Sequence, residues 1–242
     1  MIARVELQPM PEFDLTDSQR EVLSKTLMWT KAFFDNVPAG THIGGHGFDK
    51  TQRQAGMAAF IAHGEGYPIF LPVLVSMTMD IGRTSPDSRS KSWQHGLLSR
   101  EIVTPFINQL EILTEAEEIL VLDSIEDHPK KNENVRRNPI VEIAMDSDRL
   151  DCLGALGPLR SASWRPNIPL ILPDETNTES SDTGIDTMWQ DMAYRHMEWF
   201  DMLWTTAARV IVQPRVEAYK RYLEELRLEA TFMYGAFRKL DL

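Results

Sequence analysis

The chain has 242 residues, of which 43% are hydrophobic and 25% are charged, and its formal net charge at pH 7 is −11. This size suits one helical domain, or one domain with a small appendage, and the composition is ordinary for a globular protein. The excess of acidic residues argues against broad, sequence-independent binding of nucleic acid, which needs a cationic surface. A small basic pocket for a phosphorylated ligand is still compatible with that charge.

Other bulk features predict a cytoplasmic protein that makes no contact with a membrane. The single cysteine, Cys152, cannot form an internal disulfide, and we expect it to be a buried, unreactive thiol. Residues 1–6 lack the basic-then-apolar pattern of a secretion signal. The longest apolar stretch, residues 67–79, is too short to span a bilayer and contains Pro68 and Pro72.

Most of the chain shows the periodicity of amphipathic helices. The first predicted helix begins at a capping box, formed either by Thr16 and Gln19 or by Ser18 and Glu21. The later helices are predicted over residues 51–63, from Pro68 or Pro72 to about Gly82, and over residues 93–113, 114–125, 139–150, 188–209 and 214–239. This pattern favours an all-α fold.

Three segments lack this periodicity. Strand-like sequence occurs only at residues 2–7 and, more weakly, at residues 168–172. Residues 83–92 are polar and typical of a loop. Residues 165–186 are rich in Pro, Ser, Thr, Asn and acidic residues, so we expect a long, exposed and mobile loop there.

Five short motifs along the chain bear on a possible metal site. They are Lys50 in GHGFDK, Met79-Asp80 in SMTMDIGR, His95 in WQHGLLS with His128 in SIEDH, and Asp148 in MDSDRLDCLGA. In this order the motifs resemble those of the HD superfamily of metal-dependent phosphohydrolases, and the resemblance runs from about residue 45 to about residue 229. It implies an HD-domain helical bundle over residues 1–242. Its parts would be a core of about 15–164, C-terminal helices of about 188–239 and a loop at 165–187.

The resemblance also implies an altered metal site. The family's primary metal positions correspond to Lys50, Met79, Asp80 and Asp148 in this chain. An ammonium group has no lone pair, and a thioether is a soft ligand poorly suited to Mg²⁺ or Mn²⁺. A divalent ion (Mn, Mg, Fe or Zn) would then be bound by Asp80, His95, His128 and Asp148. Alternatively it is absent, because Lys50 and Met79 occupy ligand positions.

A cation at the vacated position would offset the repulsion between two carboxylates. We therefore hypothesise that Lys50 pairs with Asp80 and Asp148 in place of the metal; the alternative is a solvated lysine on a helix face. The resemblance places His95 and His128 where relatives hold a second metal or contact substrate phosphate. The alternative for both is that they are polar pocket residues bonded to water or carboxylates.

Basic residues of the same motifs predict a site for a small anionic or phosphorylated ligand. Arg53 follows Lys50 by one helical turn and should share its face. Arg149 and Arg160 match basic positions of the family, and with Arg53 and His128 they are the expected substrate-binding residues. A structural ion pair between Arg149 and Asp146 is the favoured alternative for that arginine.

Three functions are compatible with the resemblance. The first is hydrolysis of a phosphate monoester or nucleotide, with Lys50, Asp80 and His95 as catalytic residues. The second is a catalytically inactive HD protein that binds a ligand or a partner. The third is metal-independent chemistry in the same pocket, with Lys50 or His95 as acid or base. We expect no nucleic-acid partner, and the chain could form a homo-oligomer.

Overall fold

The computed structural model describes residues 11–38, 45–84, 94–164, 168–171 and 187–240. Within these ranges the chain is predominantly helical and contains no strand, which confirms the all-α prediction. The prediction of a strand at 168–172 is wrong for residues 168–171, which are irregular. Residues 2–7, most of the predicted loop at 83–92 and most of the predicted loop at 165–187 lie outside the described ranges.

The helices follow the predicted order, with additions near the C-terminus. The α-helices are α1 (Asp17–Asp35), α2 (Phe48–Gly64), α3 (Phe70–Thr78), α4 (His95–Ile107), α5 (Glu115–Asp127), α6 (Pro139–Cys152), α7 (Gly157–Trp164), α8 (Met188–Gln190), α9 (Met197–Asp201) and α10 (Thr206–Arg238). The other helical elements are the 3-10 turns η1 (Ile81–Thr84) and η4 (Asn132–Asn134) and the π-helical turn η6 (Asp191–His196).

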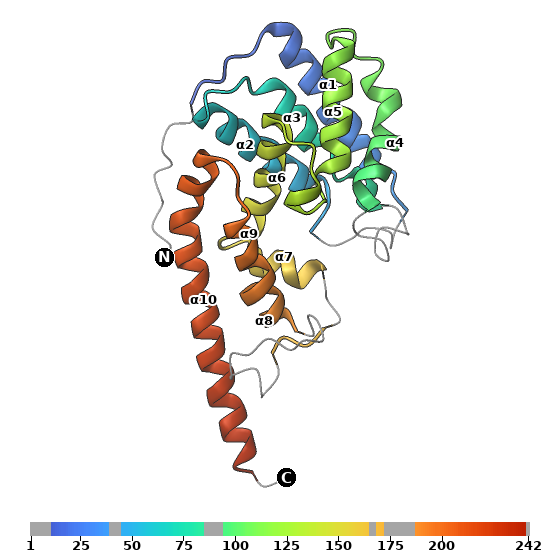
Figure 1. The fold of residues 1–242 in the computed structure, drawn as a ribbon. Helices are drawn as coiled ribbons and strands as arrows, with labels where there is room; N and C mark the ends of the chain where they lie inside the picture. The colour runs from blue at the N-terminus through green and yellow to red at the C-terminus, as the bar shows by residue number, and fades with distance from the viewer. Residues whose placement is uncertain (1–10, 39–44, 85–93, 165–167, 172–186, 241–242) are drawn as a thin grey trace.

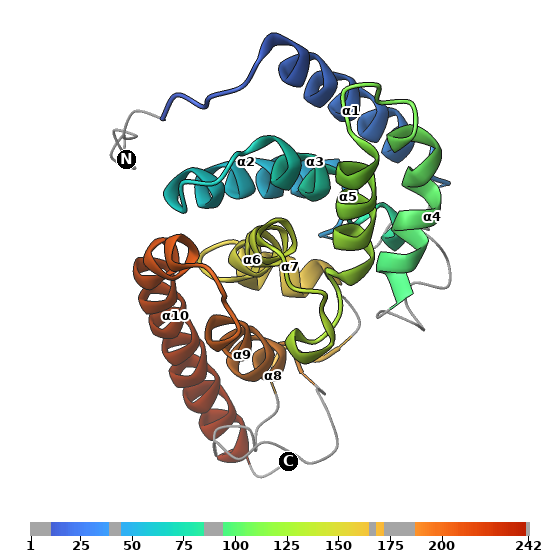
Figure 2. The same cartoon turned by 45° about the horizontal axis from the view of Figure 1, so that its top comes forward.

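The arrangement places α2, α3 and α6 at the centre of the molecule (Figures 1 and 2). Helix α1 covers one side of this group, α4 and α5 pack at its edge, and α7 to α9 lie beyond α6. The main hydrophobic core lies between these helices and includes fully buried side chains such as Ile61, Leu74 and Ile143. A second, smaller cluster, which includes Trp189, Met192 and Leu223, joins the α8 region to α10.

Local sequence explains where several helices begin. The Thr16 hydroxyl accepts a hydrogen bond from the backbone N–H of Gln19, and the Gln19 side chain bonds back to Thr16, which confirms the predicted capping box. Helix α6 begins with Asn138 as its N-cap and with Pro139 in the first turn, where a missing N–H costs no hydrogen bond. These caps set the register of the polar residues that follow them.

The C-terminal helices differ from the prediction. The helix expected over 188–209 ends at α9, and α10 begins at Thr206 and continues through Pro214. The carboxylate of Asp146 accepts the backbone N–H groups of Trp204 and Thr205, so a contact from α6 holds the segment between α9 and α10. No helix in the described ranges has the length and apolar character needed to cross a bilayer.

Candidate functional site

Five helical elements bring the predicted site residues together. Helix α2 supplies Lys50, the turn after α3 supplies Asp80, and α6 supplies Asp148. His95 is the first residue of α4, and His128 is the C-cap of α5. Helix ends and a short turn therefore present three of the five side chains, while α2 and α6 present the other two from within a helix.

Lys50 lies between the two carboxylates and is 1% exposed. Its Nζ donates to Asp80 Oδ2 and lies 2.9 Å from Asp148 Oδ1. The arrangement matches the pairing hypothesised from the sequence and does not match a solvated lysine. An ammonium group thus neutralises charge that would otherwise be left on two facing carboxylates.

Gln54 completes this side of the site. It lies one helical turn after Lys50 and is fully buried, and its Nε2 donates to Asp148 Oδ1 at 2.9 Å and to Asp80 Oδ2 at 3.2 Å. Its spacing of four residues from Lys50 was the only signal of this role in the sequence. Arg53, which was predicted from the sequence to bind substrate, lies three residues after Lys50 and pairs with Asp151 instead.

The electrostatics keep both carboxyls ionised. Burial alone would raise the pKa of Asp80, but the Lys50 ammonium and His128 outweigh burial and hold that pKa well below its usual range. Burial opposes ionisation of Asp148 in the same way, and Lys50 with Arg160 holds its pKa far below the usual value. Both residues are therefore anionic across the physiological range.

The other oxygen of Asp80 faces nitrogen atoms at longer distances. Asp80 Oδ1 lies 3.5 Å from His95 Nε2, 3.6 Å from His128 Nε2 and 3.5 Å from Arg83 Nε. The two histidine Nε2 atoms are 2.8 Å apart. His128 Nδ1 is 2.6 Å from the carbonyl oxygen of Ile125, to which it donates, so its Nε2 carries the lone pair in the neutral ring.

These three ligand atoms fit a single divalent ion. Asp80, His95 and His128 are buried, and each offers one ligand atom within 4.8 Å of the others. With separations of 2.8, 3.5 and 3.6 Å, a point equidistant from all three lies about 1.9 Å from each, close to the roughly 2.0–2.2 Å of metal–nitrogen and metal–oxygen bonds. The carbonyl bond to His128 is the type of outer contact that orients a ligating imidazole.

The remaining predicted metal ligand, Asp148, lies outside this trio. Asp148 Oδ1 bonds Lys50, Gln54 and Arg160. Met79 is fully buried in the hydrophobic core. The trio therefore shares Asp80 with the ion pair of Lys50, whereas Met79 takes no part in the site.

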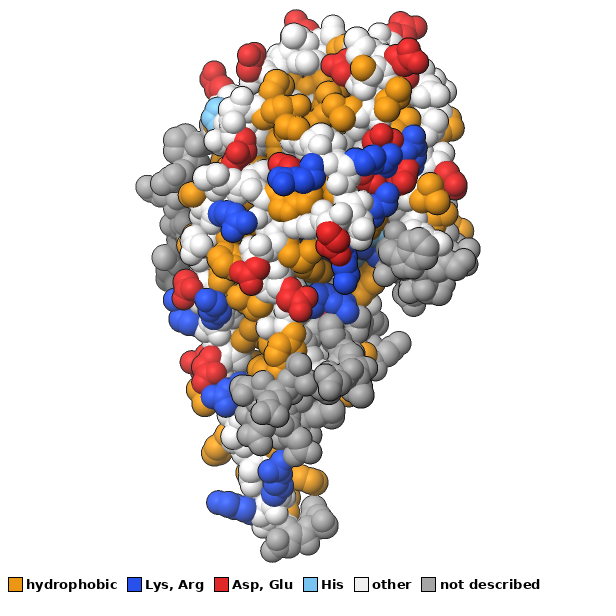
Figure 3. All heavy atoms as spheres, in the orientation of Figure 1, with side chains coloured by type: hydrophobic (Ala, Val, Ile, Leu, Met, Phe, Trp, Pro, Cys, Tyr) orange, Lys and Arg blue, Asp and Glu red, His pale blue; other side chains and the backbone are white. Residues whose placement is uncertain are grey.

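A cavity of about 330 Å³ opens next to the histidines. It is lined by Arg83, His95, His128, Pro129, Lys130, Lys131, Met145, Asp148, Arg149, Arg195, Glu198, Trp199 and Met202. Five of these side chains are cationic and two are acidic, which contrasts with the net charge of −11 for the whole chain. Figure 3 also shows Lys and Arg side chains gathered at mid-height on the right of the face in view.

The cationic residues of the cavity differ in how strongly they are held. Lys130 pairs with Glu126 and Asp127, whereas Lys131 is exposed and forms no ion pair within the described part of the chain. Arg83 packs over the ring of Trp164, with its Cζ 5.0 Å from the ring centroid. Arg83 was predicted from the sequence to begin a loop and was not among the predicted site residues.

The three arginines predicted to bind substrate are placed differently. Arg149 lines the cavity but donates to the Met202 carbonyl at 2.6 Å and lies 3.5 Å from Asp146, so it has a structural contact as well. Arg160 donates to Asp148 at 3.0 Å and is not part of the cavity wall. Arg53 pairs with Asp151 at 2.7 Å and lines a different pocket.

Two glycines allow the site helices to approach each other. A Cβ added at Gly82 would collide with the His95 carbonyl oxygen and the Ser99 backbone nitrogen. One added at Gly96 would collide with the Glu126 carbonyl oxygen and the Pro129 ring. The distances between Asp80, His95 and His128 therefore depend on glycine at both positions.

Cys152 is inert in this setting. The thiol is 3% exposed, and burial raises its pKa to about 12. A thiol that is protonated at neutral pH is a poor nucleophile, so the cysteine takes no part in the chemistry of the site.

Solved structures with the same architecture come from several bacteria, although no family model and no curated protein sequence matches the chain. Bacillus subtilis YpgQ in complex with ADP is 18% identical, with a TM-score of 0.61, over 86% of this chain and 97% of YpgQ. An HD-superfamily hydrolase from Bacillus thuringiensis is 19% identical, with a TM-score of 0.64, over 87% and 97% of the two chains. A predicted HD superfamily hydrolase from an uncultured Thermotogales bacterium is 16% identical, with a TM-score of 0.54, over 87% and 91%. The chain has the fold of the HD-domain superfamily.

Proposed function

We propose that the cavity beside His95 and His128 binds a small phosphorylated ligand, with a nucleotide as the leading class. The excess of cationic side chains in its wall carries this proposal, because phosphate oxygens are recognised by clustered Arg and Lys groups. Lys131 and Arg195 lie on this wall, and the ring of Trp199 offers an apolar surface beside them. The complex of YpgQ with ADP shows that one protein with this fold accommodates a nucleotide.

We propose further that Asp80, His95 and His128 hold one divalent ion at the end of this cavity. When bound, such an ion polarises a phosphoryl oxygen and lowers the pKa of coordinated water, as phosphoester hydrolysis requires. The chain's own residues would prepare the site. Lys50 and Gln54 hold Asp80 Oδ2, so that Oδ1 stays directed toward the histidines.

The binding proposal is tested by titration with ADP and with inorganic phosphate, each with and without Mn²⁺. We expect saturable binding, weakened about threefold to tenfold by Lys131→Ala, since this exposed lysine has no structural ion pair to lose. Lys239→Ala, at the exposed C-cap of α10, is the matched control. No binding of either compound at millimolar concentration would contradict the proposal.

A second candidate is ligand binding without hydrolysis. It is favoured by Lys50, which already supplies positive charge to Asp80 and Asp148 without a metal. Elemental analysis of the purified protein and its His128→Ala variant, followed by a phosphatase assay with added Mn²⁺, distinguishes the two functions. Stoichiometric metal that is lost in the variant, together with activity, supports hydrolysis. Ligand binding without metal and without activity supports the second candidate.

A further inference from the structure

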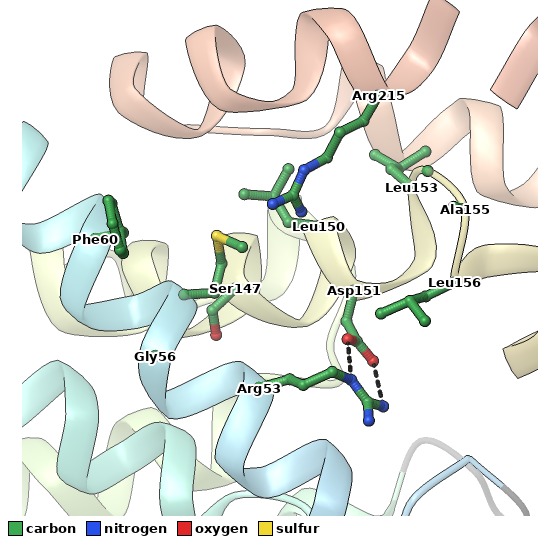
Figure 4. Close-up of a pocket in the computed structure, with 12 residues that line it drawn as sticks. Arg53, Gly56, Phe60, Ser147, Leu150, Asp151, Leu153, Ala155, Leu156 and Arg215 are labelled. Carbon is green, nitrogen blue, oxygen red and sulfur yellow. Dashed lines mark hydrogen bonds and ion pairs between the residues drawn. The ribbon is translucent and has the colours of Figure 1, made fainter. Parts of the chain in front are cut away.

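A second pocket, of about 480 Å³, lies between α2, α6 and α10 and shares no lining residue with the cavity of the proposed phosphate site. Its wall is mainly apolar, and Figure 4 shows the residues around it. The lining residues are Arg53, Gly56, Met57, Phe60, Ser147, Leu150, Asp151, Leu153, Gly154, Ala155, Leu156 and Arg215. A pocket of this volume is in the usual range for small-molecule sites.

The charges of this pocket leave one cation in excess. Arg53 and Asp151 form a two-point ion pair at one side, with N–O distances of 2.7 and 3.2 Å (Figure 4). Arg215 reaches into the pocket from α10 on the opposite side. Arg53 also pairs with Asp49 at 2.7 Å and Asp151 lies 3.4 Å from Arg160, so the arginines of this group exceed its aspartates by one positive charge.

Arg215 is the group that lacks a counter-ion. It forms no hydrogen bond and no ion pair with any residue in the described ranges, and its carbon stem packs against Gly154, where an added Cβ would lie 3.2 Å from Arg215 Cβ. Burial lowers the pKa of Arg215, which Asp151 opposes only through space. Removing a guanidinium partly from water without a bonded anion costs free energy that an anionic ligand would offset.

We propose that this pocket binds an amphipathic monoanion, namely a medium-chain carboxylate whose headgroup bonds Arg215 and whose tail lies on the apolar wall. Met57, Phe60 and Leu150 provide the apolar surface for the tail. A single negative charge matches the single excess cation, whereas the dianion of a phosphate monoester would leave a negative charge uncompensated. On the polar side of the pocket, Arg53 is already paired with Asp151, so its charge is not available to a ligand.

The chain offers two substitutions that test this site without disturbing the fold. Arg215→Met removes the charge and keeps an unbranched stem to pack against Gly154. Gly56→Leu places a side chain at the pocket wall, where a Cβ meets no atom within 4 Å. Gly235→Leu, at an exposed glycine of α10 that also meets no atom within 4 Å, is the matched control. Thermal melting of each variant checks that it is folded.

Isothermal titration calorimetry of the whole protein with decanoate, decanol and decyl phosphate is the test. We expect decanoate to bind, Arg215→Met to weaken it about tenfold or more, Gly56→Leu to abolish binding, and Gly235→Leu to leave it unchanged. Absence of decanoate binding to the wild-type protein would overturn the proposal. Equal affinity for decanol, tighter binding of decyl phosphate, or affinities unchanged by both pocket variants would overturn it as well.

Discussion

The two oxygens of Asp80 face two different environments. Oδ2 is bonded directly to Lys50 and Gln54, whereas Oδ1 faces His95, His128 and Arg83 at 3.5–3.6 Å. On the Oδ2 side an ammonium already balances the carboxylates. On the Oδ1 side the three potential ligand atoms have the spacing of a metal site, so one carboxylate can hold an ion pair with one oxygen and offer the other to a metal.

The largest expected effect comes from removing the cation on the Oδ2 side. Lys50→Met leaves Asp80 and Asp148 facing each other without compensation, so we expect the free energy of unfolding to fall by about 3–5 kcal/mol. Chemical denaturation measures this change. Lys25→Met is the control, because that exposed lysine pairs only with Glu21 on the surface and should cost under about 0.5 kcal/mol. Similar stabilities for the two variants would contradict the interpretation of Lys50.

The Oδ1 side is tested by its affinity for metal. His128→Ala removes one of three ligands, and we expect the affinity for Mn²⁺ to fall about 100-fold while the unfolding midpoint in the absence of metal changes much less than in Lys50→Met. Titration followed by paramagnetic relaxation measures the affinity. If His128→Ala bound Mn²⁺ as tightly as the wild-type protein, the trio would not be the metal site.

At acidic pH the stability of the protein should depend on His196, a buried histidine outside the site, and not on Asp80 or Asp148. Burial lowers the pKa of His196 to about 4, although Asp191 opposes the shift. As the pH falls below about 6.5, the unfolded chain takes up this proton before the folded chain does, so stability falls. We expect His196 to contribute a loss of roughly 2 kcal/mol between pH 7 and pH 5, which His196→Gln removes, while His46, whose pKa burial also lowers, adds a loss that both proteins share. Asp80 and Asp148 stay ionised over this range because their pKa values are lowered, and a pH dependence unchanged in His196→Gln would contradict the assignment.

The smallest effect concerns Gln54. Gln54→Leu removes the bonds from the amide to both carboxylates, but it also removes a buried Oε1 that has no hydrogen-bond partner. The two changes oppose each other, and we expect a net loss of about 1 kcal/mol. Urea denaturation at pH 7 measures it. A loss as large as that of Lys50→Met would mean that the amide, and not the ammonium, holds the carboxylates together.

The resemblance of the motif order to the HD superfamily predicts which residues meet at Asp80, since residues so far apart in the sequence share no local pattern. The sequence could not show whether Arg53 or Gln54 contacts Asp80. Both lie about one turn from Lys50, and the neighbouring helices decide which of them points to Asp80. Helix periodicity likewise predicted the fold class. It could not predict the start of α10, which depends on Asp146, a residue almost sixty positions earlier in the chain.

The cavity could not be predicted from the sequence either. Its basic wall combines residues from η1, α6, η6 and the segment between α5 and η4, and only the packing of these elements brings them to one place. Arg83 follows Asp80 by three residues and could have been considered for that reason. Arg195 lies more than 60 positions after Asp80, His95 and His128 in the sequence, so no local pattern pointed to it.

Gly82 and Gly96 limit which amino-acid substitutions this protein tolerates. Positions that resemble metal ligands carry a lysine and a methionine here, and the fold accommodates both by bonding one and burying the other. The two glycines have no such freedom, because any other residue adds an atom where a neighbouring backbone already lies. The geometry of the site thus depends on two positions that carry no functional group, and we expect substitution at either one to disturb it without changing a ligand atom.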